Sequence, residues 1–389
     1  MHNTNSLANG FPVAFEPVNL GEPMNVHSSW ERTRANTINS ATVPSGSCGQ
    51  YDLKLPILGM GCWAYGGGHY WGAQNQNDVN EVVRFAVEHG CNFFDTAEAY
   101  NDGASETSLG LALQGIPREQ VIIGTKISPS NTQPDKLARH CDASLKRLRT
   151  DYVDLYMVHW PITPHSIRHF DAEMTVVPQV QDAFDTLREL KDAGKVRYVG
   201  VSNFGAAKLE EAQAMGAEIV INELPYSLLT RAIELEILPK CRALGIGVLG
   251  YMSLLQGVLA DIYPTLDEVP VWQRRTRHFD SRRTPHTRHG LPGAEAETNA
   301  ALAAVRAISK AHGMTMPEVA LKWTMARPGI TSSLCGSRNL AELQQNLQAA
   351  QEPLAPEIIE ELDAATAPLL QKLGPSFDYY ESPANDRTR

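Results

Sequence analysis

Short apolar runs alternate with helix-forming segments along most of the chain, and this alternation restricts the fold more than any other feature. The first four apolar runs are LPILGMGCW, NFFDTA, VIIGTKI and YVDLYMVHW, and a segment with helical periodicity follows each of them. Nearly continuous apolar strands separated by helices indicate a parallel sheet covered by helices. Eight such units follow one another, and eight is the number that closes into a barrel. The predicted fold class is therefore α/β, a (β/α)8 TIM barrel.

The ends of the predicted helices and the flanking segments define the domain organisation. Glycine ends helices readily because it adopts a left-handed conformation, and we expect such C-caps at Gly90, Gly194, Gly216, Gly245 and Gly313. Residues 1–50 are rich in Asn, Ser, Pro and Gly without a sustained period, which predicts an irregular N-terminal arm. We expect the barrel in residues 51–370, with a last helix packed outside it, and a C-terminal tail in residues 371–389.

Composition excludes several classes of function. The 389 residues suit one barrel with extensions, and 43% hydrophobic residues suit a sizeable core. A formal net charge of −10 argues against a nucleic acid or a membrane surface as the main partner. The six cysteines have neither metal-ligand nor disulfide-framework spacing, so we expect reduced thiols and a cytoplasmic location. We also expect no signal peptide and no transmembrane segment.

Three successive predicted strands each end in a titratable residue. These residues are Asp95, Lys126 and His159, and Tyr100 follows Asp95 by five positions. The carboxyl ends of the strands share one face of a parallel barrel, where catalytic groups lie. A neighbouring cation lowers the pKa of an acid by about 1–3 pH units, so we expect Lys126 to bring the Tyr100 phenol towards its working range. Asp95 would keep the buried Lys126 charged.

The same four residues point to carbonyl chemistry. His159 can orient a carbonyl oxygen by a hydrogen bond or relay a proton. Because the sequence implies no metal and no covalent nucleophile, a bound hydride donor is the simplest completion of the site. Structural interpretations remain open for single residues, since Asp95 could cap a turn and His159 could be a packed core residue. Lys126 follows mostly apolar residues and needs a partner in either case.

From about Leu53 to about Ala350, the chain resembles the NADP-dependent aldo-keto reductase family. The motifs that carry the resemblance are GCW, FFDTAEAY, GTK, VHWP, VGVSNF, GYMSLLQG and CGSRNLAELQQN. The resemblance implies that Tyr100 is the general acid and that Asp95, Lys126 and His159 complete a catalytic tetrad. It also implies a small-molecule carbonyl or alcohol substrate.

The resemblance further implies a site for NADP(H). Ser202 and Asn203 would bind the nicotinamide carboxamide, Tyr251 would stack on the ring, and Arg338 would bind the 2′-phosphate. Alternatively, Ser202 and Asn203 cap a helix, Tyr251 is a core aromatic residue and Arg338 is a solvated surface residue. The full set of expected cofactor contacts is Gly61, Cys62, Trp63, Asp95, Ser202, Asn203, Glu223, Tyr251, Met252, Ser253, Leu254, Leu255, Gln256, Gly257, Arg274, Gly336, Ser337, Arg338, Glu342, Gln345 and Asn346.

Several of these positions depart from the family pattern. Glu223 stands where the family commonly has Gln, and its carboxylate would favour the oxidised, cationic nicotinamide. Met252 and Ser253 replace the usual Ser-Pro pair, and Cys62 replaces Thr. Glu342 and Gln345 exchange an acid and an amide near the adenine.

Two long segments leave the predicted catalytic face. One follows His159, and the other, residues 260–297, contains six arginines and three histidines. These basic residues could order the segment over NADPH or meet an anionic substrate; a solvated basic loop is the alternative. The aromatic residues expected at the substrate opening suit a sugar or a polycyclic ketone as well as a small aldehyde. The expected substrate contacts are Trp63, Tyr65, Trp71, Tyr100, His159 and Trp160, with His69 and Tyr70 beside them.

The predicted function is an NADPH-dependent oxidoreductase that interconverts an aldehyde or ketone and its alcohol. A regulatory subunit that holds NADPH and turns over slowly is the alternative from another class. Family members of that kind tend to lack the His, so His159 favours an enzyme. A metal-dependent barrel enzyme is a third interpretation, but the sequence offers no ligand cluster and we expect no metal. The sequence is compatible with an oligomer.

Overall fold

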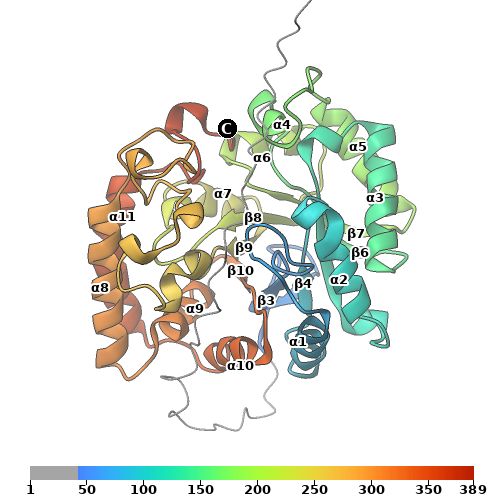
Figure 1. The fold of residues 1–389 in the computed structure, drawn as a ribbon. Helices are drawn as coiled ribbons and strands as arrows, with labels where there is room; N and C mark the ends of the chain where they lie inside the picture. The colour runs from blue at the N-terminus through green and yellow to red at the C-terminus, as the bar shows by residue number, and fades with distance from the viewer. Residues whose placement is uncertain (1–42) are drawn as a thin grey trace, which may run out of the picture. The chain divides into compact units, whose positions relative to one another are not determined.

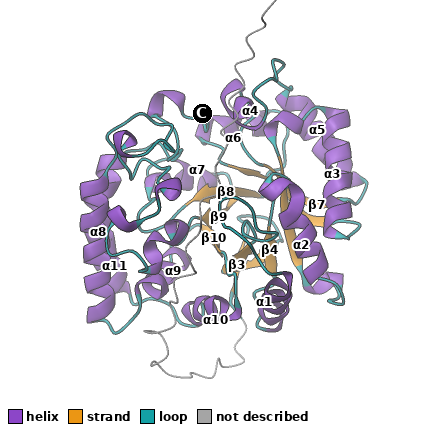
Figure 2. Cartoon of the chain, in the orientation of Figure 1, coloured by secondary structure: helices purple, strands orange, loops and turns teal. Residues whose placement is uncertain are grey.

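Eight parallel strands form a closed barrel in the computed structural model, which describes residues 43–389. Helices surround the central strands (Figure 1; Figure 2). The strands follow the order β10-β3-β4-β5-β6-β7-β8-β9, so neighbours in sequence are neighbours in the barrel. The prediction of a (β/α)8 barrel is confirmed. The barrel strands are β3 (Leu58–Gly61), β4 (Phe93–Asp95), β5 (Ile122–Ile127), β6 (Val153–Val158), β7 (Val196–Ser202), β8 (Ile221–Pro225), β9 (Gly247–Tyr251) and β10 (Ile330–Cys335).

The helices cover the barrel through apolar stripes. In α1, Val79, Val82, Val83 and Ala86 are buried, a spacing that places them on one face of the helix. Gly90 then takes a φ of 78°, as expected for the residue that ends a helix. The helices are α1 (Gln76–Glu88), α2 (Ala104–Ala112), α3 (Pro134–Leu148), α4 (Pro164–Phe170), α5 (Val180–Asp192), α6 (Ala206–Ala214), α7 (Ile237–Ala243), α8 (Glu295–Ala311), α9 (Met316–Met325), α10 (Leu340–Ala349) and α11 (Pro356–Leu373).

A β-hairpin lies against one end of the barrel. Strands β1 (Ser45–Ser47) and β2 (Lys54–Pro56) pair antiparallel. A Cβ atom on Gly46 would lie 2.4 Å from the Thr331 carbonyl oxygen, so only glycine allows β1 to approach β10 this closely. The predicted arm boundary at residue 50 is wrong, because it falls inside this hairpin. The rest of the predicted arm, residues 1–42, lies outside the described residues.

The barrel interior is a packed apolar core. Phe93, Leu155, Met157 and Leu249 pack there with hairpin residues such as Leu55, and all are fully buried. This packing fills the barrel below the strand ends, so the interior is a core and not a channel.

The C-terminal tail packs back onto the barrel. The Thr388 carbonyl oxygen accepts a hydrogen bond from the Gly205 backbone N–H, and the Tyr379 carbonyl oxygen accepts one from Arg277. Asp378 and Arg387 form a buried ion pair whose side chains are 0% and 4% exposed. The tail therefore lies beside the segment that follows β9 (Figure 1). We refer to the segment from Phe377 to Arg389 as the C-terminal strap.

Candidate active site

The ends of adjacent strands bring the predicted tetrad together. Asp95 is the last residue of β4, Lys126 is the penultimate residue of β5, and His159 directly follows β6. Register places Asp95 beside Gly124 and Lys126 beside Met157 on neighbouring strands. Tyr100 begins a 3-10 turn after β4. All four side chains therefore belong to one face of the barrel, at the carboxyl ends of the strands.

Lys126 is the electrostatic centre of the site. Its ammonium Nζ lies 2.6 Å from both carboxylate oxygens of Asp95 and 3.0 Å from the Thr96 carbonyl oxygen. The same Nζ lies 3.5 Å from the Tyr100 hydroxyl. The side chain of Lys126 is completely buried. Burial disfavours its charge, but the neighbouring carboxylates outweigh this effect and hold the pKa of Lys126 above its ordinary value.

Glu223 places a second carboxylate on the same ammonium. Its Oε2 lies 3.1 Å from Lys126 Nζ, and both side chains are almost fully buried. Burial first, and then the negative charge of Asp95, raise the pKa of Glu223 to about 8. The pKa of Asp95 is also raised, mainly by burial. Two buried carboxylates therefore face the single charge of Lys126, and the raised pKa of Glu223 favours its protonated form at neutral pH.

Glu223 was predicted to contact the nicotinamide, and its contact with Lys126 was not predicted. A signal was present, because Glu223 lies near the carboxyl end of its apolar run, as Asp95 and Lys126 do. In the structure, register places Glu223 beside Ser202 of β7. Position along the strand thus marked Glu223 as a residue of the same face, but only the barrel closure shows which cation it meets.

Tyr100 has a higher pKa than the sequence analysis predicted. Burial raises its pKa, the Lys126 charge lowers it, and the charges of Asp95 and Glu223 raise it again. The balance lies well above the ordinary value for a phenol. The expectation that Lys126 brings this phenol into its working range is wrong, because desolvation and two carboxylates offset one ammonium. The phenol therefore keeps its proton at neutral pH.

His159 is a neutral imidazole beside the phenol. The ring centroids of Tyr100 and His159 lie 5.6 Å apart in an edge-to-face arrangement. Burial and the nearby positive charge of Lys126 hold the pKa of His159 well below its ordinary value. Its Nδ1 atom is buried and has no hydrogen-bond partner among residues 43–389. A neutral imidazole here can donate one hydrogen bond to a ligand oxygen.

The expected carboxamide contacts lie directly beside the tetrad. The Asn203 amide Nδ2 donates to the His159 carbonyl oxygen at 3.1 Å and to Ser202 Oγ at 2.9 Å. The Tyr251 hydroxyl donates to Asn203 Oδ1 at 2.8 Å. Asn203 has a φ of 62°, which is unusual for a residue other than glycine. These bonds hold Ser202, Asn203 and Tyr251 in one rigid group at the ends of β7 and β9.

A strained turn follows β9. Met252, Leu255 and Gln256 have φ values of 62°, 44° and 53°, and Gly257 has a φ of 96°. Left-handed residues in succession form concave turns, and a concave turn can suit a phosphate. Ser253 fixes the turn, since its hydroxyl donates to the Leu334 carbonyl oxygen at 2.9 Å. The residues present therefore fit the pyrophosphate of a dinucleotide.

The residues expected at the adenosine end surround the start of α10. The Arg338 guanidinium donates to Gln74 Oε1 at 2.9 Å and to the Ala73 carbonyl oxygen at 2.7 Å. Glu342 accepts from the Arg338 backbone N–H at 2.9 Å. Arg338 thus connects the end of β10 to the loop before α1 and is not a freely solvated side chain.

Other residues expected to contact the cofactor lie on or near β3, β10 and α10. Asn346 Nδ2 donates to Ser337 Oγ at 3.0 Å, and Gln345 is exposed. Gly336 and Gly61 face each other, since a Cβ on Gly336 would lie 3.3 Å from the Gly61 carbonyl oxygen. Cys62 is completely buried.

Arg274 is not brought to the site. Its guanidinium donates to the Val269 carbonyl oxygen at 2.8 Å and to the Asp267 carbonyl oxygen at 2.7 Å, both within its own loop. The next residue, Arg275, occupies the position facing the catalytic end instead. Its Cζ lies 4.4 Å from the ring centroid of Tyr70.

Aromatic side chains border the tetrad. Trp63 stacks on Tyr70 at 4.9 Å and meets Trp71 edge to face at 5.3 Å. The ring centroid of Trp63 lies 6.1 Å from that of Tyr100. We call Trp63, Tyr70 and Trp71 the aromatic mouth. The ring centroid of Phe170 lies 5.6 Å from that of His159.

Two of the expected substrate contacts lie below this surface. Tyr65 is completely buried in the core, so its prediction as a substrate contact is wrong. Trp160 is 7% exposed, and the Arg387 guanidinium lies over its ring at 3.9 Å. The C-terminal strap therefore covers Trp160. Tyr70, which was only a neighbour in the prediction, lies in the mouth.

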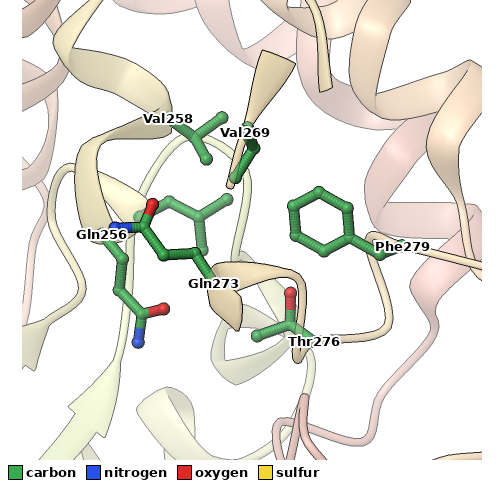
Figure 3. A pocket seen from close by; sticks show the side chains of 7 residues that line it. Gln256, Val258, Val269, Gln273, Thr276 and Phe279 are labelled. Carbon is green, nitrogen blue, oxygen red and sulfur yellow. The ribbon is translucent and has the colours of Figure 1, made fainter. Parts of the chain in front are cut away.

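Two cavities lie away from the tetrad. One is a gap of about 10 Å³, room for about one water molecule, between the strained turn and the loop after it (Figure 3). Gln256, Gln273 and Phe279 are among its lining residues. The other, of about 450 Å³, lies at the hairpin end and is lined by residues such as Gln50 and Arg242. Neither is lined by a tetrad residue.

Among residues 43–389, no group of three or more His, Cys, Asp and Glu side chains could hold a metal ion. In the same part of the chain, no helix has the length and apolar character needed to cross a membrane.

Comparison with known proteins agrees with the geometry. Residues 57–367 match the model of the aldo/keto reductase family. The NADH-specific methylglyoxal reductase of Escherichia coli is 31% identical over 341 residues, which cover 81% of this chain and 98% of that protein.

Solved structures show the same fold. A thermostable aldo-keto reductase in complex with the inhibitor epalrestat is 26% identical, has a TM-score of 0.63, and covers 83% of this chain and 99% of its own. An aldo/keto reductase from Klebsiella pneumoniae in complex with NADP and acetate is 23% identical, with a TM-score of 0.62 and coverages of 87% and 99%. The chain therefore belongs to the aldo/keto reductase family, oxidoreductases that reduce carbonyl groups with NAD(P)H.

Proposed function

We propose that this protein reduces an aldehyde or a ketone with NADPH and that Tyr100 donates the proton. The observation that carries the proposal is the contact between the Lys126 ammonium and the Tyr100 hydroxyl, 3.5 Å apart, with a neutral His159 beside them. A proton donor, a cation that stabilises its conjugate base and a hydrogen-bond donor for the carbonyl oxygen are the groups that carbonyl reduction requires.

Each side chain has a separate role in this proposal. The bound cofactor supplies the hydride. His159 donates a hydrogen bond that orients the substrate oxygen, and Tyr100 gives its proton to the same oxygen as negative charge develops there. Lys126 stabilises the phenolate that remains, and Asp95 keeps Lys126 charged and aimed. The phenol is protonated at neutral pH, which is the state that proton donation to a carbonyl oxygen requires.

Ser202, Asn203 and Tyr251 would hold the nicotinamide, and the turn Met252–Gly257 would hold the pyrophosphate. Arg338 supports a preference for NADPH, since its guanidinium lies at the adenosine end and suits a phosphate. The E. coli relative is named as NADH-specific, so this preference needs its own test. We expect Arg338→Ala to lower the ratio of kcat/KM for NADPH over NADH about tenfold or more. An unchanged ratio would show that Arg338 does not select the cofactor.

The decisive experiment follows NADPH consumption with a panel of aldehydes, ketones and keto-sugars that includes methylglyoxal, the substrate named for the E. coli relative. We expect steady turnover, and a loss of about 10²–10⁴-fold in Tyr100→Phe with NADPH affinity retained. Full activity in Tyr100→Phe would refute the role of this phenol. Tight NADPH binding with only one slow turnover across the panel would instead favour the regulatory subunit.

A further inference from the structure

Arg275 differs from the other arginines of the segment after β9. In the described part of the chain, each of the other five donates to a carboxylate or to backbone carbonyl groups. The acceptors are Asp280 for Arg282, Asp267 and Glu295 for Arg283, Glu381 for Arg288, the carbonyls of Leu373 and Ser376 for Arg277, and those of Asp267 and Val269 for Arg274. Arg275 has no carboxylate partner among residues 43–389. Its buried Nε has no hydrogen-bond partner there either.

Aromatic rings hold the Arg275 guanidinium on three sides. Its Cζ lies 4.4 Å from the ring centroid of Tyr70, 5.5 Å from that of Tyr380 and 5.8 Å from that of Trp63. Gln256 fixes two of these rings, because it accepts from the Tyr70 hydroxyl at 2.7 Å and donates to the Tyr380 hydroxyl at 2.9 Å. Ring faces attract a cation but do not neutralise it. The guanidinium is therefore positioned before any ligand binds.

The aromatic mouth connects Arg275 to the tetrad residue Tyr100. Trp63 lies near both groups, since its ring centroid is 5.8 Å from Arg275 Cζ and 6.1 Å from the ring centroid of Tyr100. The cation and the phenol therefore both border this side chain. Trp71 lies in the same mouth, and its buried Nε1 has no hydrogen-bond partner among the described residues. Two buried donors without acceptors, Arg275 Nε and Trp71 Nε1, therefore lie among the side chains of the aromatic mouth.

Other arginines lie near His169, which follows the catalytic side of β6. Burial first, and then the charges of Arg387 and Arg288, lower the pKa of His169 to about 4, although Asp378 raises it. Arg275 also lowers this pKa. Arg387 and Arg288 are each paired with a carboxylate, whereas Arg275 is not. A partly desolvated cation without a counter-charge is costly unless a ligand supplies one.

We propose that Arg275 binds an acidic group of the substrate, so that the preferred substrates are carbonyl compounds that carry a carboxylate. This inference rests on the proposed carbonyl reduction and names its substrate class. A guanidinium binds any oxyanion. The oxyanion could therefore come from the substrate carboxylate, as proposed, or from a phosphate of the dinucleotide. The two sources differ in which affinity depends on Arg275.

The test compares 4-formylbenzoate with its neutral near-isostere 4-formylbenzamide. Both present the same aromatic aldehyde, and only one carries a charge. We expect the wild-type protein to have a higher kcat/KM for 4-formylbenzoate. Arg275→Met should lower the ratio of the two kcat/KM values about 10- to 100-fold, the worth of a charge-assisted pair of hydrogen bonds. Arg275→Lys should fall between, because it keeps the charge and loses the planar geometry.

Arg283→Met serves as the matched control, since it removes an arginine of the same segment that already pairs with two carboxylates. It should leave the ratio unchanged. A wild-type enzyme without a preference for 4-formylbenzoate, or an equal loss on both aldehydes in Arg275→Met, would overturn the proposal. So would a weakened NADPH affinity with an unchanged ratio, which would assign the guanidinium to the cofactor.

A binding measurement distinguishes a failure of this proposal from a failure of the proposed carbonyl reduction. If neither aldehyde is reduced, the carbonyl-reductase proposal fails for this aldehyde class. Quenching of tryptophan fluorescence in the presence of NADP⁺ still measures the dissociation constants of 4-formylbenzoate and 4-formylbenzamide. Tighter binding of 4-formylbenzoate that is lost in Arg275→Met would support the anion site. Equal binding of the two compounds by the wild-type protein would refute it.

Discussion

Glu223→Gln should change how the stability of this protein depends on pH. The pKa of Glu223 is raised from 4.5 to about 8, so between these values the folded state holds a proton that the unfolded state has released. Stability then falls as pH rises through this window, by about 1.4 kcal/mol per pH unit for one proton. Between about pH 5.5 and about pH 7.5 the wild-type protein should lose about 3 kcal/mol of unfolding free energy from this residue alone.

Glutamine is nearly isosteric with glutamate and does not titrate, so the variant lacks this contribution. The free energy of unfolding of Glu223→Gln, relative to wild type, should therefore increase by about 3 kcal/mol over the same two pH units. Urea denaturation followed by tryptophan fluorescence at three pH values measures the difference. Glu360→Gln, an exposed position on α11, is the control and should run parallel to wild type.

Parallel pH profiles for Glu223→Gln and the wild-type protein would refute the reasoning. They would mean that Glu223 is ionised in the folded state, with Lys126 facing two full negative charges. A relative stability that falls with rising pH would contradict it more strongly, because the sign of the proton linkage would then be reversed.

Three further predictions concern catalysis and the C-terminal strap. Lys126→Met should lower kcat by about 10²–10⁴-fold in an NADPH assay, since the phenolate loses its stabilising cation, and should leave NADPH binding measured by fluorescence intact. Because the pKa of Tyr100 is raised and that of His159 is lowered, the rate of carbonyl reduction should be flat from about pH 6 to about pH 7, whereas alcohol oxidation should rise with pH; a bell-shaped reduction profile in this range would contradict this. Asp378→Asn leaves Arg387 buried without its counter-charge and should lower the free energy of unfolding, measured by urea denaturation, by about 3–5 kcal/mol. Arg387→Met should then cost less in the Asp378→Asn background than it does in the wild-type protein.

Much of the active site could be located from sequence because it depends on local position along strands. A polar residue that ends a buried strand of a parallel barrel lies at the face where the carboxyl ends meet, so the sequence alone places Asp95, Lys126 and His159 together. The fold class followed from the same periodicity. Glycine at the ends of helices was predictable for a similar reason, since its left-handed conformation is a local property.

Electrostatic balance was not predictable in this way. The pKa of Tyr100 depends on the sum of one cation, two carboxylates and desolvation, and the sequence analysis counted only the nearest cation. The burial of Tyr65 and the covering of Trp160 by Arg387 depend on how loops pack, which has no period in the sequence.

The sequence by itself determined the barrel, the face proposed for the chemistry and the positions of the four residues of the proposed tetrad, because strand periodicity and strand ends are encoded by neighbouring residues. Only the tertiary structure decided that Glu223 shares Lys126 with Asp95, and that Arg275 rather than Arg274 faces the mouth. It also decided that the C-terminal strap returns over the site. These contacts join residues far apart in the chain, and their energies depend on burial and charge, which exist only once the barrel has closed.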